Sequence, residues 1–389
     1  MNPLERVHEI LETLIRFDTV SARSNMALIH WVRDYLLRHG VESTVVPNDE
    51  GTKANLYATL GPKRAGGVVL SGHTDVVPVE GQAWSSEPFH MTRRDGRLYG
   101  RGTADMKGFI ACALAAVPDF LATKLATPIH LAFSYDEEVG CIGVPHLLAR
   151  LARDLPKPAA AIIGEPTMMR VVTGHKGLAA WRTIFTGVEA HSSRIEEAVS
   201  AIFAASQFIE YLRGIAADLR EGVKDPAFEP PFTTINVGKI AGGQAMNIVA
   251  GQCTLDWEFR PLPGVDYVAL GARIRAHVEG ELRPALKKKH PGADVELIQL
   301  AGGPGLMPEP DSKAEALARR LTGANRSGTV AYGTEAGLFQ RTGISSVVCG
   351  PGDIEQAHKP DEFVALDQLA QCAAFLAKLK DWAAGAPEF

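Results

Sequence analysis

The chain has 389 residues, of which 46% are hydrophobic and 22% charged, a composition typical of a globular protein with two or three domains. Its formal net charge of −5 lacks the basic excess that nucleic-acid or membrane-surface binding requires, so we expect a small-molecule partner, no nucleic acid and no membrane. No apolar run approaches the roughly 18 residues of a membrane span, which favours a cytoplasmic location.

The first predicted elements belong to an α/β sheet. Residues 1–17 form an amphipathic pattern with regularly placed charges, which predicts a surface helix rather than a secretion signal. Further along, short apolar runs alternate with helical patterns, as in parallel strands that are buried on both faces. These runs cover residues 67–70, 129–133, 159–163 and 345–349.

The middle of the chain follows a different pattern. Strands and helices are predicted there in the order βαββαβ, which is the ferredoxin-like arrangement of a small sheet with two helices on one face. The predicted strands are 178–185, 233–240, 253–259 and 293–300, and the predicted helices are 195–219 and 267–285. We therefore expect an inserted domain at residues 177–302, between two parts of a larger domain at 1–176 and 303–389.

Cysteine usage indicates a reducing environment. The five cysteines include no CxxC pair, so they are expected to be reduced thiols, mostly in the core. A cysteine zinc site is correspondingly improbable, and any metal in this chain would need histidine and carboxylate ligands.

Acidic residues and histidines follow several of the predicted strands. They lie in the segments SGHTD (71–75), SYDEEVG (134–140), IGEP (163–166) and CGPGDIEQAH (349–358). Because ligands of open α/β sheets collect outside the carboxyl ends of the strands, we expect these segments to converge. Their side chains suit Zn²⁺ or a similar metal: His73, Asp75, Glu137, Glu138, Glu165 and His358.

Two further features belong to this pattern. In GRGTADMKG (100–108), Asp105 lies near the start of a helix predicted over 109–117, either as a helix cap or as another ligand. The segment matches neither a GxGxxG nor a Walker sequence. Asp75, two residues after His73, is positioned to accept the proton of the second imidazole nitrogen and thereby orient a ligating histidine.

The segments SGHTDVVP, GRGTADMKG, DEEVG, GEPT and AHKPDEF, in order from about residue 70 to 365, resemble the metal-site motifs of the dinuclear zinc amidohydrolase and peptidase family. The resemblance implies a zinc-peptidase-like catalytic domain, a mixed and largely parallel sheet sandwiched by helices, with an inserted lid and dimerisation domain. It also implies two Zn²⁺ or Co²⁺ ions. His73 and Glu165 would hold one ion, Glu138 and His358 the other, and Asp105 would bridge both.

The same resemblance assigns catalytic roles. Glu137 matches the general base, which takes a proton from water and returns it to the leaving amine. In the inserted domain, Ser193 and Glu196 predict a capping box for a helix that begins near Arg194, which leaves His191 on the preceding loop. The matching histidine in the family reaches the active site of a partner subunit and stabilises the oxyanion, so we expect a homodimer.

Substrate contacts are implied for Asn247 and Arg260, and the guanidinium fork of Arg260 suits an α-carboxylate. Ala250 departs from the proline that is common in the family. Glu335 either faces the cationic side of the substrate or is a loop carboxylate paired with a neighbouring helix. Asp136 has no assigned role beyond an expected backbone or outer-shell contact.

Within the family, YGTEAGLFQ (332–340) and CGPGDIEQAHKPDEF (349–363) most resemble the branch that hydrolyses the acetyl amide of N2-acetyl-L-ornithine in arginine biosynthesis. The branch that acts on succinyl-diaminopimelate usually has Ser-Asp-Gly at the positions of Thr334, Glu335 and Ala336. The alternatives are another N-acyl-amino-acid amidohydrolase or exopeptidase of the family, and a non-catalytic binding protein of the same fold.

Overall fold

The structure, a computed structural model, describes residues 2–385. Met1 and residues 386–389, at the outer ends of the first and last predicted segments, lie outside the described residues. The chain divides into two compact units. The first unit contains the chain up to Gly174, Leu306–Thr329 and the chain from Thr334 onward, and the second contains His175–Gly305 and Val330–Gly333. The sequence placed the corresponding boundaries after residues 176 and 302.

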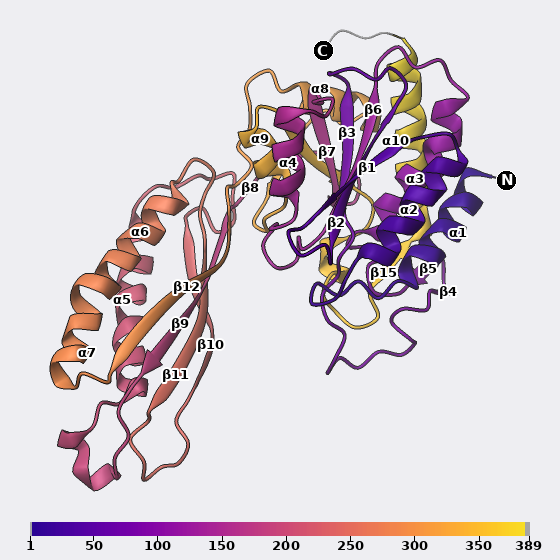
Figure 1. Ribbon diagram of the computed structural model, residues 1–389. Helices are drawn as coiled ribbons and strands as arrows, with labels where there is room; N and C mark the ends of the chain where they lie inside the picture. The colour runs from indigo at the N-terminus through magenta and orange to yellow at the C-terminus, as the bar shows by residue number, and fades with distance from the viewer. Residues whose placement is uncertain (1, 386–389) are drawn as a thin grey trace. The chain divides into compact units, whose positions relative to one another are not determined.

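A mixed eight-stranded sheet organises the first unit (Figure 1). Its central strands β6, β3, β7 and β14 run parallel, whereas β2 pairs antiparallel with both β1 and β6. The predicted mixed α/β fold is thereby confirmed. In spatial order the strands are β1 (Ser43–Pro47), β2 (Ala54–Leu60), β6 (Ile129–Ser134), β3 (Val68–His73), β7 (Ala160–Pro166), β14 (Ser345–Gly350), β8 (Val172–His175) and β13 (Gly328–Val330).

Helices cover both faces of this sheet. Figure 1 shows α4 and α9 on one side and α1, α2, α3 and α10 on the other, where α8 joins the same apolar core. Helix α3 packs closely, because a Cβ atom at Gly164 would lie 2.0 Å from the Phe109 ring. The helices are α1 (Pro3–Ile15), α2 (Met26–Arg38), α3 (Lys107–Leu121), α4 (Val144–Arg153), α8 (Lys313–Thr322), α9 (Ala336–Arg341) and α10 (Leu366–Ala384).

A small antiparallel sheet in the first unit joins two distant parts of the chain. It consists of β4 (Thr92–Arg94), β5 (Arg97–Tyr99) and β15 (Phe363–Ala365), in the order β15-β5-β4. Phe363 pairs with Tyr99, so the residues that precede β15 lie beside those that follow β5.

The second unit has the predicted βαββαβ order. Its antiparallel sheet has the order β10-β11-β9-β12, and its helices lie on one face (Figure 1) around a separate core. A π-helical turn, Val278–Leu282, joins the last two helices. The elements are β9 (Leu178–Thr186), α5 (Ala201–Glu221), β10 (Thr234–Gly242), β11 (Gln252–Arg260), α6 (Tyr267–His277), α7 (Arg283–Lys289) and β12 (Asp294–Gly303).

The predicted helix start near Arg194 is wrong. Residues Ser192–Glu197 form only a short 3₁₀ helix, with Arg194 outside helical geometry at φ −115° and ψ 45°. Val199 then pairs with Val188, which keeps the chain extended. Helix α5 begins after this bridge, where the Ser200 hydroxyl accepts the N–H of Phe203. The Ser-x-x-Glu pattern therefore does not act as a capping box for the long helix.

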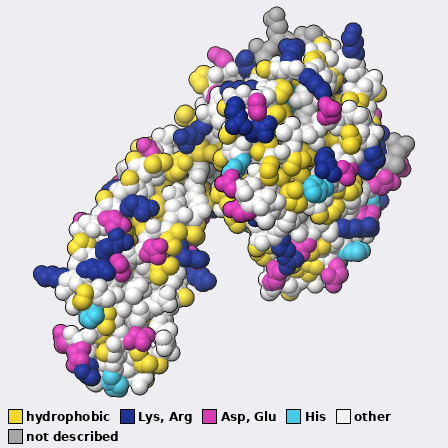
Figure 2. Space-filling view, in the orientation of Figure 1, with side chains coloured by type: hydrophobic (Ala, Val, Ile, Leu, Met, Phe, Trp, Pro, Cys, Tyr) yellow, Lys and Arg dark blue, Asp and Glu magenta, His cyan; other side chains and the backbone are white. Residues whose placement is uncertain are grey.

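Among residues 2–385, no helix is both long and apolar enough to cross a membrane. On the face of the second unit shown in Figure 2, Lys and Arg side chains are interspersed with Asp and Glu.

Candidate metal centre

The acidic and histidine-bearing segments converge at the carboxyl ends of the parallel strands in the first unit. His73 is the last residue of β3, and Glu165 is the penultimate residue of β7. Glu138 lies on the loop after β6, His358 on the loop after β14, and Asp105 just before α3. The topology alone brings these five residues to one edge of the sheet, as the sequence predicted.

The side chains of these residues form a continuous cluster. His73 Nε2 lies 2.9 Å from Asp105 Oδ1 and 3.7 Å from Glu165 Oε1. On the other side of Asp105, Oδ2 lies 3.4 Å from His358 Nε2, which is 3.0 Å from Glu138 Oε2. The two oxygens of Asp105 thus face different histidines, which is the arrangement required of a carboxylate between two metal positions. Asp105 does not cap α3, because no side chain caps that helix.

Two overlapping groups of side chains have ligand atoms close enough to hold a metal ion. One contains His73, Glu137 and Glu165, and the other contains His73, Asp105 and Glu138, with all ligand atoms in each group within 4.8 Å of one another. Glu137 therefore lies near enough to serve either as a base or as a ligand. Its carboxylate also accepts a hydrogen bond from the Cys141 thiol at 3.3 Å.

The electrostatics of the cluster favour extra positive charge. Burial, reinforced by neighbouring carboxylates, raises the pKa of Glu137 to about 8 and that of Glu138 to about 7. Burial also raises the pKa of Glu165 well above its usual range. Hydrogen bonds to Asp105 and Glu138 raise the pKa of His358 to about 10. The cluster holds protons because so many carboxylates cannot ionise together without cations.

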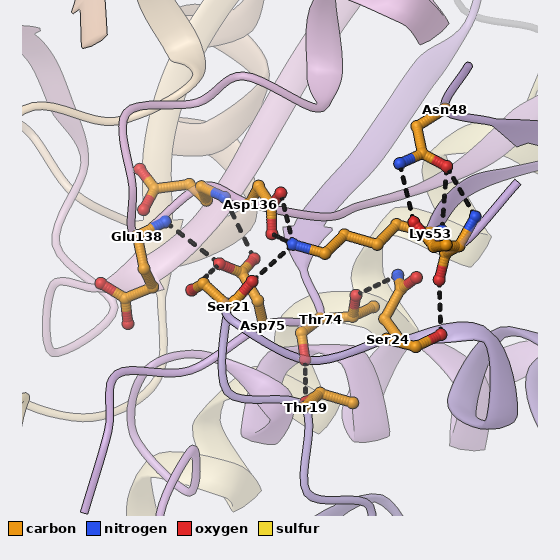
Figure 3. Close-up of polar contacts among 12 residues, drawn as sticks. Thr19, Ser21, Ser24, Asn48, Lys53, Thr74, Asp75, Asp136 and Glu138 are labelled. Carbon is orange, nitrogen blue, oxygen red and sulfur yellow. Dashed lines mark hydrogen bonds and ion pairs between the residues drawn. The ribbon is translucent and has the colours of Figure 1, made fainter. Parts of the chain in front are cut away.

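Asp75 orients the site differently from the prediction. The carbonyl oxygen of Asp75, not its carboxylate, accepts the hydrogen bond of His73 Nδ1 at 2.9 Å, while Oδ1 lies 3.7 Å away. The carboxylate instead accepts the backbone N–H groups of Glu137 and Glu138, at 3.1 and 3.2 Å, and the Ser21 hydroxyl at 2.7 Å (Figure 3). Since a carbonyl can only accept, Nδ1 carries the hydrogen and Nε2 is free to ligate.

Asp136 anchors the same loop. Both of its carboxylate oxygens lie 2.6 Å from Lys53 Nζ, which also donates to the Ser21 carbonyl (Figure 3). The backbone of Asp136 is in the left-handed region at φ 55°. The sequence did not reveal Lys53 or Ser21 as part of the site. No local signal marks them, since Lys53 is 83 positions from its partner.

Glu335 lies close to Glu137 of the cluster, and it is only 1% exposed. Among the described residues, no hydrogen bond of good geometry reaches its carboxylate, but the hydroxyls of Ser134 and Ser71 lie close enough to lower its pKa. Burial raises the pKa of Glu335 to about 7. The expectation that it pairs with a neighbouring helix has no support in this geometry.

The site residues predicted in the second unit lie at its two ends. His191 pairs with Ile248, and Asn247 accepts the N–H of Ser192 through its carbonyl oxygen, so His191 and Asn247 are neighbours. Arg260 ends β11, whereas this pair lies beyond the start of that strand. The guanidinium of Arg260 forms a bidentate contact with Glu258 at 3.0 and 3.1 Å. One small ligand therefore cannot contact both ends of the unit.

Comparison with known sequences decides the family. The model of peptidase family M20/M25/M40 matches residues 69–381, which include every residue of the cluster. The chain belongs to peptidase family M20/M25/M40. Its predicted membership in a family of metal-dependent hydrolases is thereby confirmed.

Individual members of family M20/M25/M40 extend this result. The chain is 34% identical over 381 residues to an acetylornithine deacetylase of Photorhabdus laumondii, a match that covers 96% of both chains. Its fold is similar to that of the M20 family metallo-carboxypeptidase Sso-CP2 of Sulfolobus solfataricus, with a TM-score of 0.79, 17% identity and coverage of 99% and 100%. It is also similar to the Bacillus subtilis YXEP protein, described as a dinuclear metal-binding peptidase, with a TM-score of 0.63, 16% identity and 99% coverage of both chains.

The side chains of the cluster are chemically suited to bind a pair of metal ions. They combine imidazole nitrogens with carboxylate oxygens, which suit Zn²⁺ and related ions. The central carboxylate, Asp105, presents one oxygen to each histidine. Cations at these positions would replace the protons that the buried carboxylates otherwise retain.

Proposed function

We propose that this protein hydrolyses the acetyl amide of N2-acetyl-L-ornithine to L-ornithine and acetate, a step of arginine biosynthesis. The observation that carries the proposal is the near full-length similarity to an acetylornithine deacetylase, at 34% identity over 96% of both chains. The intact set of metal-ligating side chains supports a catalytic member of the family over a binding protein that has only the fold.

The proposed cofactor is a pair of Zn²⁺ or Co²⁺ ions. His73 and Glu165 would hold one ion, Glu138 and His358 the other, and Asp105 would lie between them, in keeping with its two facing histidines. When bound, such ions polarise the substrate carbonyl and lower the pKa of a bound water.

Glu137 is the proposed proton carrier. Its backbone N–H donates to Asp75, and its partly buried carboxylate lies within the cluster. Glu137 takes a proton from the attacking water at a carboxylate oxygen and returns it to the nitrogen of the leaving amine. Asp75 acts as a positioning residue for this step, since its carboxylate holds the Glu137 and Glu138 amides while its carbonyl holds His73.

The proposed active enzyme is a homodimer in which His191 serves the site of the partner subunit. At about 3.4 Å per residue, the strand between His191 and Arg260 is roughly 27 Å long, too far for both to contact one small substrate. Strand β10 lies at the edge of its sheet, where its backbone is available for pairing. Exposed apolar side chains lie on β10 and α5, with Ile240 53% and Phe203 64% exposed. Both features support a second copy as the partner.

Substrate contacts are proposed for three residues. Asn247 is exposed beside His191 and is available to a substrate bound at the partner's site. Arg260 would exchange Glu258 for the substrate α-carboxylate. Glu335 supplies a buried carboxylate without a cationic partner, and the ammonium group of ornithine would favour its ionised form. The five cysteines of the described residues are free thiols rather than disulfides, which supports the reducing cytoplasm as the proposed location.

The substrate assignment can be tested by comparing kcat/KM for three compounds with Zn²⁺ or Co²⁺ added. We expect N2-acetyl-L-ornithine to exceed both N-succinyl-diaminopimelate and the uncharged analogue N2-acetyl-L-norvaline by tenfold or more. In Glu335→Gln, the preference for ornithine over norvaline should fall roughly 10-fold, because a charged contact is lost. Preference of the native enzyme for the succinylated compound would assign the chain to the desuccinylase reaction instead.

A further inference from the structure

A buried glutamate outside the ligand set holds the loop that carries Asp105. Glu362 Oε1 accepts three backbone N–H groups, from Gly102 at 3.0 Å, Ala104 at 2.9 Å and Asp105 at 3.1 Å. Glu362 is 1% exposed. One carboxylate oxygen therefore fixes the backbone of the whole turn before α3, including the residue between the two proposed metal positions.

The second oxygen of Glu362 connects this turn to a buried arginine. Oε2 lies 2.7 Å from Arg101 Nη1, and Arg101 is also 1% exposed. Such a pair is costly to break, because removal of one partner leaves a buried charge without its counter-ion. The guanidinium also lies over the ring of Trp84, 5.0 Å from its centroid.

The contacts of Arg101 continue to the loop of His358. Arg101 Nη2 donates to Gln82 Oε1 at 2.5 Å, and Gln82 Nε2 donates to the carbonyl oxygen of His358 at 2.9 Å. Arg101 Nη1 also lies 3.3 Å from the carbonyl oxygen of Lys359. His358 itself has a left-handed backbone, with φ 64°, which these carbonyl contacts hold in place.

The small sheet explains why these groups meet. Strand β15 begins directly after Glu362, and β5 ends just before Gly100 and Arg101. Their pairing, together with the hydrogen bond from Gly100 N–H to the Glu362 carbonyl at 2.9 Å, fixes the glutamate beside the turn. Two loops more than 250 positions apart are thus joined by one hydrogen-bonded network, in which the Glu362–Arg101 pair is buried.

We propose that Glu362, acting through Arg101 and Gln82, is a positioning residue that sets Asp105 and His358 at the spacing a metal pair requires. None of the three is itself among the proposed ligands. The inference rests on the proposed metal centre, not on the identity of the substrate. Outer contacts of this kind typically change metal affinity by roughly 10- to 100-fold.

Two variants separate the parts of the network. In Glu362→Gln, one acceptor oxygen is lost, so either the turn or Arg101 is left unpaired. We expect the affinity for both metal equivalents to fall roughly 10- to 100-fold. Gln82→Ala removes the hydrogen bond to the His358 carbonyl and the acceptor for Arg101 and Trp84, but it leaves every hydrogen bond between Glu362 and the turn of Asp105 in place. One equivalent should therefore weaken roughly 10-fold while the other is unchanged. The control is Glu355→Gln, an exposed carboxylate on the same loop as His358 that pairs with Lys359.

The readout is metal binding rather than turnover. Zn²⁺ affinities are measured by competition with a chromophoric chelator, the Co²⁺ absorption spectrum reports ligand geometry, and thermal unfolding of the metal-free proteins reports folding. Native affinities and an unchanged Co²⁺ spectrum in folded Gln82→Ala would overturn the proposal, even where Glu362→Gln fails to fold. A native chain that binds fewer than two metal equivalents would instead overturn the proposed metal centre.

Discussion

Glu137 and Glu138 are adjacent in sequence but have different surroundings. Glu138 Oε2 lies 3.0 Å from His358 Nε2, whereas Glu137 accepts the thiol hydrogen of Cys141. The shared feature is the backbone, since both amide groups donate to the Asp75 carboxylate. The backbone of this loop is therefore held by Asp75, while the two partly buried side chains have separate partners and can take separate roles.

Isosteric substitutions should separate these roles. Glu137→Gln should bind two metal equivalents with near-native affinity and lose roughly 10²- to 10⁴-fold in kcat, because only the proton carrier is removed. Glu138→Gln should lose affinity for one equivalent. Metal content after dialysis and steady-state kinetics with N2-acetyl-L-ornithine provide the test. Full activity of metal-loaded Glu137→Gln would exclude Glu137 as the base, and loss of a metal equivalent from it would make Glu137 a ligand.

At the scale of single residues, the sequence predicted which side chains converge but not which hydrogen bonds hold them in place. Strand ends and residue types were sufficient to gather His73, Glu138 and Glu165, because parallel strands end at one edge. Asp105 was placed between them only by the family resemblance, since it precedes a helix. The hydrogen-bond partner of His73 was assigned to the wrong atom of Asp75, since spacing does not distinguish a carbonyl from a carboxylate. Glu362 could not be predicted as an anchor, because its partners lie about 260 positions away.

At the scale of elements, β2 and β6 share a buried histidine. His130 Nε2 donates to the Gly66 carbonyl at 2.9 Å, Nδ1 lies 2.9 Å from the Thr59 hydroxyl, and the ring stacks on Tyr57 at 5.5 Å. Burial lowers the pKa of His130 to about 4. The ring is therefore neutral in the folded protein at pH values where an unfolded chain already binds the proton.

Stability should accordingly decline as the pH falls from about 6.5 to 4, because the unfolded state binds one more proton in that range. The contribution of His130 to this decline is roughly 3 kcal/mol in total. The measurement is urea unfolding of the metal-free protein at several pH values, compared with His130→Phe. The difference in unfolding free energy between the two should shrink towards acid pH, and a constant difference would contradict the prediction. His30→Phe, at an exposed position of α2, is the control.

Element boundaries were harder to predict where tertiary pairing competes with local signals. The Ser-x-x-Glu pattern at Ser193 indicated a helix start, but the Val188 and Val199 bridge delays α5 until Ala201. The four central parallel strands were predicted well, because continuous apolar runs leave few alternatives. The buried antiparallel strand β2 was not predicted. The βαββαβ order also followed from the sequence, since its strands and helices differ clearly in period.

At the scale of the whole molecule, the chain has two units with separate cores. The proposed metal ligands and the base all lie in the first unit, whereas His191 lies in the second. Under the proposed dimer, each active site combines Glu137 of one chain with His191 of the other. A chain that lacks Glu137 and a chain that lacks His191 should therefore complement each other within one dimer.

Mixed dimers of two inactive variants should regain activity. His191→Ala alone should lose roughly 10²- to 10³-fold in kcat through the missing oxyanion donor, and Glu137→Gln is inactive for the reason given above. After dissociation and reassociation in equal amounts, half of the dimers carry one intact site, which predicts about one quarter of native activity. Activity that stays at the level of the separate variants, with mixed dimers verified by mass, would place His191 in the site of its own chain.

The separation of the metal ligands from the second unit also bears on how such enzymes diverge. Every proposed ligand, and the network of Glu362 and Arg101 behind two of them, is contained in the first unit. Substitutions in the second unit at positions other than His191 can therefore alter which molecules are accepted without changing the proposed metal ligands or the base. Apart from His191, a change of substrate that is made through Asn247 or Arg260 leaves the residues of the metal centre as they are.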